Sequence, residues 1–348
     1  MADLRFLPKK GFKDLIARLL RSYAVYGTTK KDGFPAFGRI ARFEDLILGQ
    51  PPAHLSAKEF FFPPKEAILR FDLKNNRFEP VIDAPPQAVV GLNACDIHAL
   101  NLMDRVFAHG VPDVNYLSRR SNTIIIGSDC VPDEYCFCKS LGTMRVDEGF
   151  DLFLHRAKKG FLVRVGTEKG AGMLSKGIKT RKASQGEIKE MERFEGEREA
   201  SFKTSIDAAP SELPGIYSKS DESGVWDSIG SICTGCGSCN NVCPTCYCFD
   251  VRDEMKSSLK EGERVRVWDG CTLEDFAKVA GGHNFRRKRG ERLRHRFNRK
   301  FNYLTDRFGA LFCVGCGRCI RTCLVRINIA EVTNELILEY RKRAGRQG

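Results

Sequence analysis

Two stretches of the chain carry cysteines at a spacing that suits iron–sulfur clusters. One is CTGCGSCNNVCP, which begins at Cys233, and the other is CVGCGRCIRTCL, which begins at Cys313. Both follow the pattern C-x2-C-x2-C-x3-C, in which the fourth cysteine usually binds the cluster of the other run. The pattern predicts two [4Fe–4S] clusters with crossed ligands. The expected sets are Cys233, Cys236, Cys239 and Cys323 for the first cluster, and Cys313, Cys316, Cys319 and Cys243 for the second.

The repetition of this spacing favours iron over zinc. Zinc is the alternative because C-x2-C pairs also bind it. Zinc sites seldom need a third and a fourth cysteine at this spacing, and here the whole pattern occurs twice. Leu324 stands where proline usually follows the last cysteine. That departure removes no ligand, so the prediction of iron stands.

Four further cysteines lie in the first half of the chain, two of them directly after expected strands. Cys95 follows the apolar run 87–92, and Cys130 follows 122–129. If these strands are parallel neighbours, both thiols lie at the carboxyl edge of the sheet, where sites gather in open α/β sheets. We expect a third [4Fe–4S] cluster there, with buried free thiols as the alternative. The four candidate ligands are Cys95, Cys130, Cys136 and Cys138.

The three remaining cysteines, Cys246, Cys248 and Cys271, fall outside the ferredoxin pattern. They could bind iron together with an outside ligand. They could also join a cysteine of the N-terminal half, or pack as free thiols beside a neighbouring cluster. Their spacing leaves all three interpretations open.

The first half of the chain alternates strands and helices. QAVVGL (87–92) and NTIIIGSD (122–129) are typical of buried strands, and DIHALNLMDRVFA (96–108) between them is typical of a helix. This order defines a βαβ unit. FDLFLHRA and GFLVRVGT add two strands joined through KKG. We therefore predict an α/β domain over residues 1–166, with Asp96 capping the helix.

The rest of the chain changes character twice. Residues 167–222 are rich in Gly, Lys, Glu and Ser, which predicts a linker or mobile excursion. Residues 223–348 carry helical apolar stripes and both cysteine runs. Two cysteine runs that are bridged by helices resemble the α-helical ferredoxin domain of succinate dehydrogenase and heterodisulfide reductase iron–sulfur subunits. The predicted fold class is α+β, an α/β domain followed by a mainly helical dicluster domain.

The net charge of +13 raises nucleic acid as a partner. The densest basic stretch is HNFRRKRGERLRHRFNRK (283–300), which we expect to form a cationic helix. A solvated helix face that offsets cluster charge or docks an acidic partner is the preferred interpretation, because the cationic face lacks interleaved aromatic residues. A nucleic-acid-binding iron–sulfur protein is the alternative function.

Other patterns limit the class of protein. No apolar run reaches the roughly 18 residues that a membrane span needs. Clustered cysteines in a long chain, without a signal-peptide pattern, favour a reducing cytoplasm. No G-x-G-x-x-G or phosphate loop follows an expected strand, so no flavin, nicotinamide or nickel site is expected. The chain resembles a non-catalytic electron-transfer subunit more than a complete enzyme.

Several longer motifs carry a family resemblance. LSAKEFFFPPKEAILRF, GLNACDIHALNLMDRVF, CFCKSLGT, CPTCYCFDV and WDGCTLEDFAKVAGGHNFR join CVGCGRCI in matching nearly the whole chain. They resemble the family that comprises the iron–sulfur subunit of anaerobic sulfite reductase and the beta subunit of group 3 [NiFe] hydrogenases (sulfhydrogenase). The usual RPCD reads NACD here, and SPKEF reads SAKEF, without loss of a cysteine.

The resemblance implies a cytoplasmic electron-transfer subunit with several [4Fe–4S] clusters. Such subunits pair, in a hetero-oligomer, with a flavin- and NAD(P)-binding subunit, and also with a terminal catalytic subunit. The terminal subunit implied is a hydrogenase, a sulfite reductase or a heterodisulfide-reductase-like module.

Overall fold

The larger of the two sheets in the described residues has eight strands and is mixed. The computed structural model describes residues 4–175 and 177–345. The strand order is β10-β1-β9-β8-β7-β6-β2-β3, in which the four consecutive strands from β8 to β2 pair in parallel and the other pairs are antiparallel. The strands are β1 (Arg5–Pro8), β2 (Ala24–Lys31), β3 (Phe34–Arg39), β6 (Gln87–Leu92), β7 (Thr123–Ser128), β8 (Leu152–Ala157), β9 (Gly160–Val165) and β10 (Arg181–Lys182).

The expected βαβ unit is confirmed. β6 and β7 are parallel neighbours, with Val89 opposite Ile125, and every residue of both strands is buried. Helix α1 (Lys9–Ser22) packs on one face of the sheet, against Val90 and Ile126, while α2 (Ala94–Ala108) and α3 (Val114–Ser121) cover the other face. Strands covered on both faces read as continuous apolar runs, which is why they were visible in the sequence.

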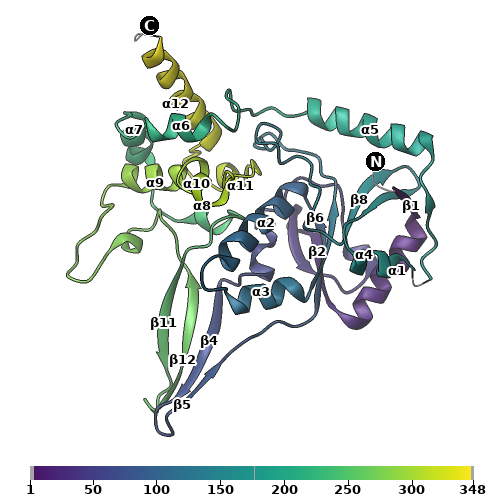
Figure 1. Ribbon diagram of the computed structural model, residues 1–348, viewed down its shortest axis with the longest axis horizontal. Coiled ribbons are helices and arrows are strands. Elements are labelled where there is room, and N and C mark those ends of the chain that lie inside the picture. The colour runs from purple at the N-terminus through teal and green to yellow at the C-terminus, as the bar shows by residue number, and fades with distance from the viewer. Residues whose placement is uncertain (1–3, 176, 346–348) are drawn as a thin grey trace.

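A second, four-stranded sheet joins distant parts of the chain. Its order is β11-β12-β4-β5, and all its pairs are antiparallel. Figure 1 shows it projecting away from the helices and the large sheet. Residues 249–268 form a hairpin, although the sequence predicted helices there. The reason is that ERVRVW alternates with a period of two, as in a strand, and pairs with β4 from the first half of the chain. The strands are β4 (Lys65–Asp72), β5 (Arg77–Pro80), β11 (Phe249–Met255) and β12 (Glu261–Trp268).

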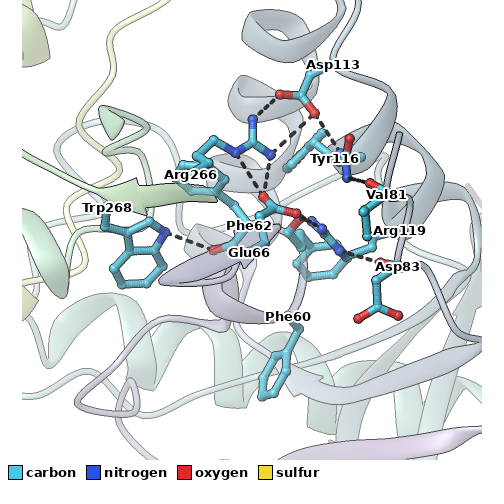
Figure 2. A network of polar contacts seen from close by, with 12 residues as sticks. Phe60, Phe62, Glu66, Val81, Asp83, Asp113, Tyr116, Arg119, Arg266 and Trp268 are labelled. Carbon is cyan, nitrogen blue, oxygen red and sulfur yellow. Dashed lines mark hydrogen bonds and ion pairs between the residues drawn. The ribbon is translucent and has the colours of Figure 1, made fainter. Parts of the chain in front are cut away.

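A buried ionic network fastens this small sheet to α3 (Figure 2). Glu66 on β4 accepts hydrogen bonds from Arg119 of α3 and from Arg266 of β12, the latter at 2.5 Å. Arg266 also pairs with Asp113 and lies 4.9 Å from the centre of the Phe62 ring. Two carboxylates thus balance two guanidiniums.

Replacing Glu66 by alanine is expected to destabilise the protein by about 3 kcal/mol, because buried Arg119 would then have no carboxylate partner and Arg266 only Asp113. The loss should lower the midpoint of chemical denaturation measured on the cluster-loaded protein. Glu254→Ala is the matched control, because its ion pair with Lys65 is half exposed and is worth at most about 1 kcal/mol. Equal midpoints for the two variants would contradict the structural role of the network.

The C-terminal half forms a helical layer around a shared aromatic core. Side chains of α6, α7, α9 and α12 meet there, among them Tyr217, Trp226, Phe297, Phe301 and Leu336. This arrangement confirms the α+β fold class. The helices are α6 (Leu213–Ser218), α7 (Val225–Ile232), α8 (Ser238–Asn241), α9 (Arg289–Phe301), α10 (Thr305–Phe308), α11 (Arg318–Arg321) and α12 (Ile329–Ala344), and the short 3-10 helices of the chain are Phe43–Asp45, Ala57–Phe60 and Asp275–Ala277.

Much of the segment 167–222 is helical. It contains α4 (Glu168–Ser175), α5 (Gln185–Ala200) and α6. Helix α5 packs on β8 and β9, whereas α6 belongs to the helical core. The domain boundary within this segment stays a prediction.

Candidate cluster sites

One cavity brings together cysteines from both runs. It is lined by Cys233, Cys236 and Cys239 of the first run and by Cys323 of the second, with Cys319 also on its wall. The first run leaves α7 and turns through Gly235 and Gly237, both with positive φ, into α8. A side chain at Gly237 would collide with Leu273, so the tight wrap of the chain requires glycine there. The four expected ligands of the first cluster share one cavity.

A second cavity has the complementary composition. It is lined by Cys313, Cys316 and Cys319 of the second run and by Cys243 of the first. Gly315 has φ 61°, and a Cβ there would lie 2.5 Å from the backbone nitrogen of Cys138. The second run therefore packs directly on the cysteine-bearing loop of the α/β domain. The two cavities have the crossed composition that the spacing predicts.

Most of the cysteines lie in positions that keep them protonated without metal. Burial raises the pKa of Cys319 to about 12 and that of Cys271 to about 11. The more exposed Cys236 differs, because contact with the Ser238 hydroxyl lowers its pKa. Iron binds thiolates, so loading the buried sites must release protons.

The basic stretch 283–300 is only partly solvated: Arg287, Lys288 and Arg289 are exposed, but several cations of α9 are not. Arg292, Arg296 and Lys300 are buried, at 5%, 2% and 5% exposure. All three belong to α9. Arg296 faces the cysteines, with its Nη1 3.3 Å from the Cys246 Sγ, whereas Arg292 donates to the backbone carbonyls of Arg286 and Arg287. Burial by itself would lower the pKa of Arg296, but nearby thiolates, Cys239 first, raise it well above its ordinary value. The expectation of a solvated face is wrong for these three side chains. The expected role of offsetting cluster charge fits Arg296 and Lys300, which lie beside the thiols.

The four N-terminal cysteines lie around the carboxyl edge of the large sheet. Cys95 is in the first turn of α2, Cys130 follows β7, and Cys136 and Cys138 occupy the next loop. Cys95 and Cys138 pack in one buried group with Cys316. Burial is the main cause that raises the pKa of Cys138, and Cys130 is the second. The effect of Cys130 indicates that these two thiols lie close together. The set lies directly beside the second cavity.

Asp96 does not cap its helix. The N-cap is Asn93, and Asp96 instead forms a bidentate ion pair with Arg318, at 2.7 and 2.8 Å. Arg318 lies inside the second cysteine run and also donates to the Ala53 carbonyl. Both partners are almost fully buried. This pair fastens the second run to the α/β domain.

The three unassigned cysteines gather near the buried cations. Cys246 contacts both the Cys243 thiol and Arg296. Burial raises the pKa of Cys271, and the charge of Arg296 opposes this shift. Cys248 also raises the pKa of Cys271, which indicates that these two thiols are neighbours. Their positions fit more than one role, and their use as iron ligands stays a prediction.

Two side chains at the site were missed by sequence reasoning. Lys58 is buried, donates to the Cys246 carbonyl at 3.0 Å and lies 3.7 Å from the centre of the Trp268 ring. A lysine two residues before the apolar run FFF was the available signal. For Arg318, the available signal was a charged residue between two cysteines of the second run. Neither has a spacing that predicts its partner.

Two neighbouring cavities, each lined by cysteines of both ferredoxin-type runs, define an iron–sulfur electron-transfer protein with two [4Fe–4S] clusters. The model of a 4Fe-4S dicluster domain matches residues 232–327. The chain is 36% identical to Sulfhydrogenase 2 subunit beta of Pyrococcus furiosus over 326 residues, 93% of this chain and 96% of that relative. The chain therefore belongs to the sulfhydrogenase beta-subunit family. No solved structure matches it, and no helix among the described residues could cross a membrane.

Proposed function

We propose that this chain relays electrons within a cytoplasmic complex, between a flavin- and NAD(P)-binding subunit, on one side, and a terminal catalytic subunit on the other. The observation that carries the proposal is that the two cluster cavities share Cys319 and Arg296 as walls. Clusters held in adjoining cavities can exchange electrons directly. The name of the relative favours a hydrogenase as the terminal subunit, ahead of a sulfite reductase or a heterodisulfide-reductase-like module.

The chain supplies binding and electrostatics to this relay. Each cluster, when bound, supplies a one-electron carrier. The crossed sets, Cys233, Cys236, Cys239 with Cys323, and Cys313, Cys316, Cys319 with Cys243, are the proposed ligands. Buried side chains such as Phe137 and Ile329 line the second cavity, whereas Cys236 leaves the first cavity partly open to solvent; the cations of α9 offset the negative charge that the thiolates bring.

A third cluster on Cys95, Cys130, Cys136 and Cys138 is part of the proposal. Their place beside Cys316 supports it, because a cluster there would extend the relay into the α/β domain. Such an extension gives electrons a path from the helical layer toward a partner bound on the large sheet.

The relay is tested by reduction through the partner. The tagged chain should copurify with a flavin-containing subunit from its native host under anaerobic conditions. NADH or NADPH should then bleach the visible absorption of the clusters in the complex but leave the isolated chain unchanged. Bleaching of the isolated chain, or none in a flavin-containing complex, would contradict the proposed place in the relay.

A further inference from the structure

Four cationic side chains are buried around the cluster sites without a carboxylate partner. Among the described residues, Arg119, Arg198, Arg266 and Arg318 are buried arginines that each pair with Asp or Glu. No ion pair with Asp or Glu is found in the described part of the chain for a second group. That group is Lys58, Arg292, Arg296 and Lys300.

A buried charge without a counter-charge is costly, so this second group requires compensation from another source. The nearest negative charges are the thiolates. For Lys300, burial would lower the pKa, but the thiolates of Cys243 and Cys246 raise it well above its ordinary value. Lys300 and the thiolates of the second site therefore neutralise each other, whereas at Lys58 burial outweighs the thiolates and lowers the pKa to about 8.

Arg296 has a special place within this group because it lines both cavities. Its guanidinium donates to the Asn240 side-chain oxygen at 3.0 Å and to the Cys239 carbonyl at 2.9 Å. It also contacts the Cys246 sulfur at 3.3 Å. These three contacts hold the charge in one position between the two cysteine sets.

Lys300 lies one turn further along α9 and lines the second cavity only. Its ammonium group donates to the Thr245 hydroxyl at 2.8 Å, and that hydroxyl lies 3.4 Å from the Cys243 sulfur. Residues four apart on a helix share a face, which explains why both cations point the same way. Helix α9 thus places the charge of Arg296 at both cavities and the charge of Lys300 at the second cavity alone.

We propose that Arg296 is a positioning residue that sets the reduction potentials of both clusters, whereas Lys300 sets the potential of the second cluster alone. A fixed positive charge in a buried site stabilises the more negative, reduced cluster and so raises its potential. The inference rests on the cluster assignment in the proposed function.

Redox titration followed by electron paramagnetic resonance tests whether Arg296 affects the potentials of both clusters and Lys300 that of one. Arg296→Met should lower the reduced-to-oxidised ratio of both clusters at least tenfold at a fixed potential, which is 59 mV for one electron. Lys300→Met should do so for one cluster only. Arg294→Met is the matched control, because Arg294 is on the same helix, lines neither cavity and contacts Asp221; it should shift neither.

Arg296→Lys keeps the charge and should leave both potentials near those of the native protein. The inference fails if Arg296→Met, with its full iron content, shifts one cluster or none. If Arg296→Met does not load iron, Lys300→Met decides, because an equal shift of both clusters there would also overturn the inference. A native chain without clusters would instead refute the proposed function, so the two failures are distinguishable.

Discussion

The double variant Cys243→Ala with Cys313→Ala is expected to lose no more iron than either single variant. The two cysteines belong to different runs but line the same cavity, so either change alone already removes that cluster. Iron should fall by about four per chain in all three variants. Anaerobic purification followed by iron and sulfide analysis measures the loss.

The matched comparison is Cys243→Ala with Cys233→Ala. These cysteines belong to the same run but line different cavities, so the double variant should lose about eight irons per chain. If the ligands were not crossed, the two double variants would exchange their results. Such an exchange would overturn the ligand assignment while leaving two clusters in place.

Asp96→Ala is expected to cost about 3–5 kcal/mol of stability and to weaken the second cluster. The change leaves the fully buried Arg318 guanidinium without its counter-charge. Arg318 stands between two proposed ligands of that cluster, Cys316 and Cys319, so its displacement would disturb them. Thermal unfolding and iron content of the variant measure the two effects.

Asp147→Ala is the control for this variant, because its ion pair with Arg164 involves a carboxylate that is 94% exposed. It should change stability by at most about 1 kcal/mol. An Asp96→Ala protein as stable as the control, with all its iron, would show that the buried pair does not fasten the second run.

The sequence predicted those features that depend on local patterns. The apolar runs at 87–92 and 122–129 predicted two parallel strands, because strands buried on both faces leave no polar alternation. The cysteine spacing predicted two crossed sets of thiols, and each set lines one cavity, with Cys319 on the walls of both. Each of these patterns is contained within a short stretch of the chain.

Features that depend on distant partners were not predictable in this way. The hairpin at 249–268 is completed by β4, from the opposite half of the chain. Asp96 resembled a helix cap because its partner Arg318 lies in the second cysteine run. The basic stretch resembled a solvated surface because nothing local reveals that Arg296 and Lys300 face the thiols.

The assignment of two [4Fe–4S] clusters is tested by an anaerobic reductive titration of the native chain, together with its metal content. We predict about eight irons for two clusters, or about twelve with the third, and one electron taken up reversibly for every four irons. Electron paramagnetic resonance should show the same number of reducible centres. Zinc in place of iron, with no visible absorption and no electron uptake, would contradict the account.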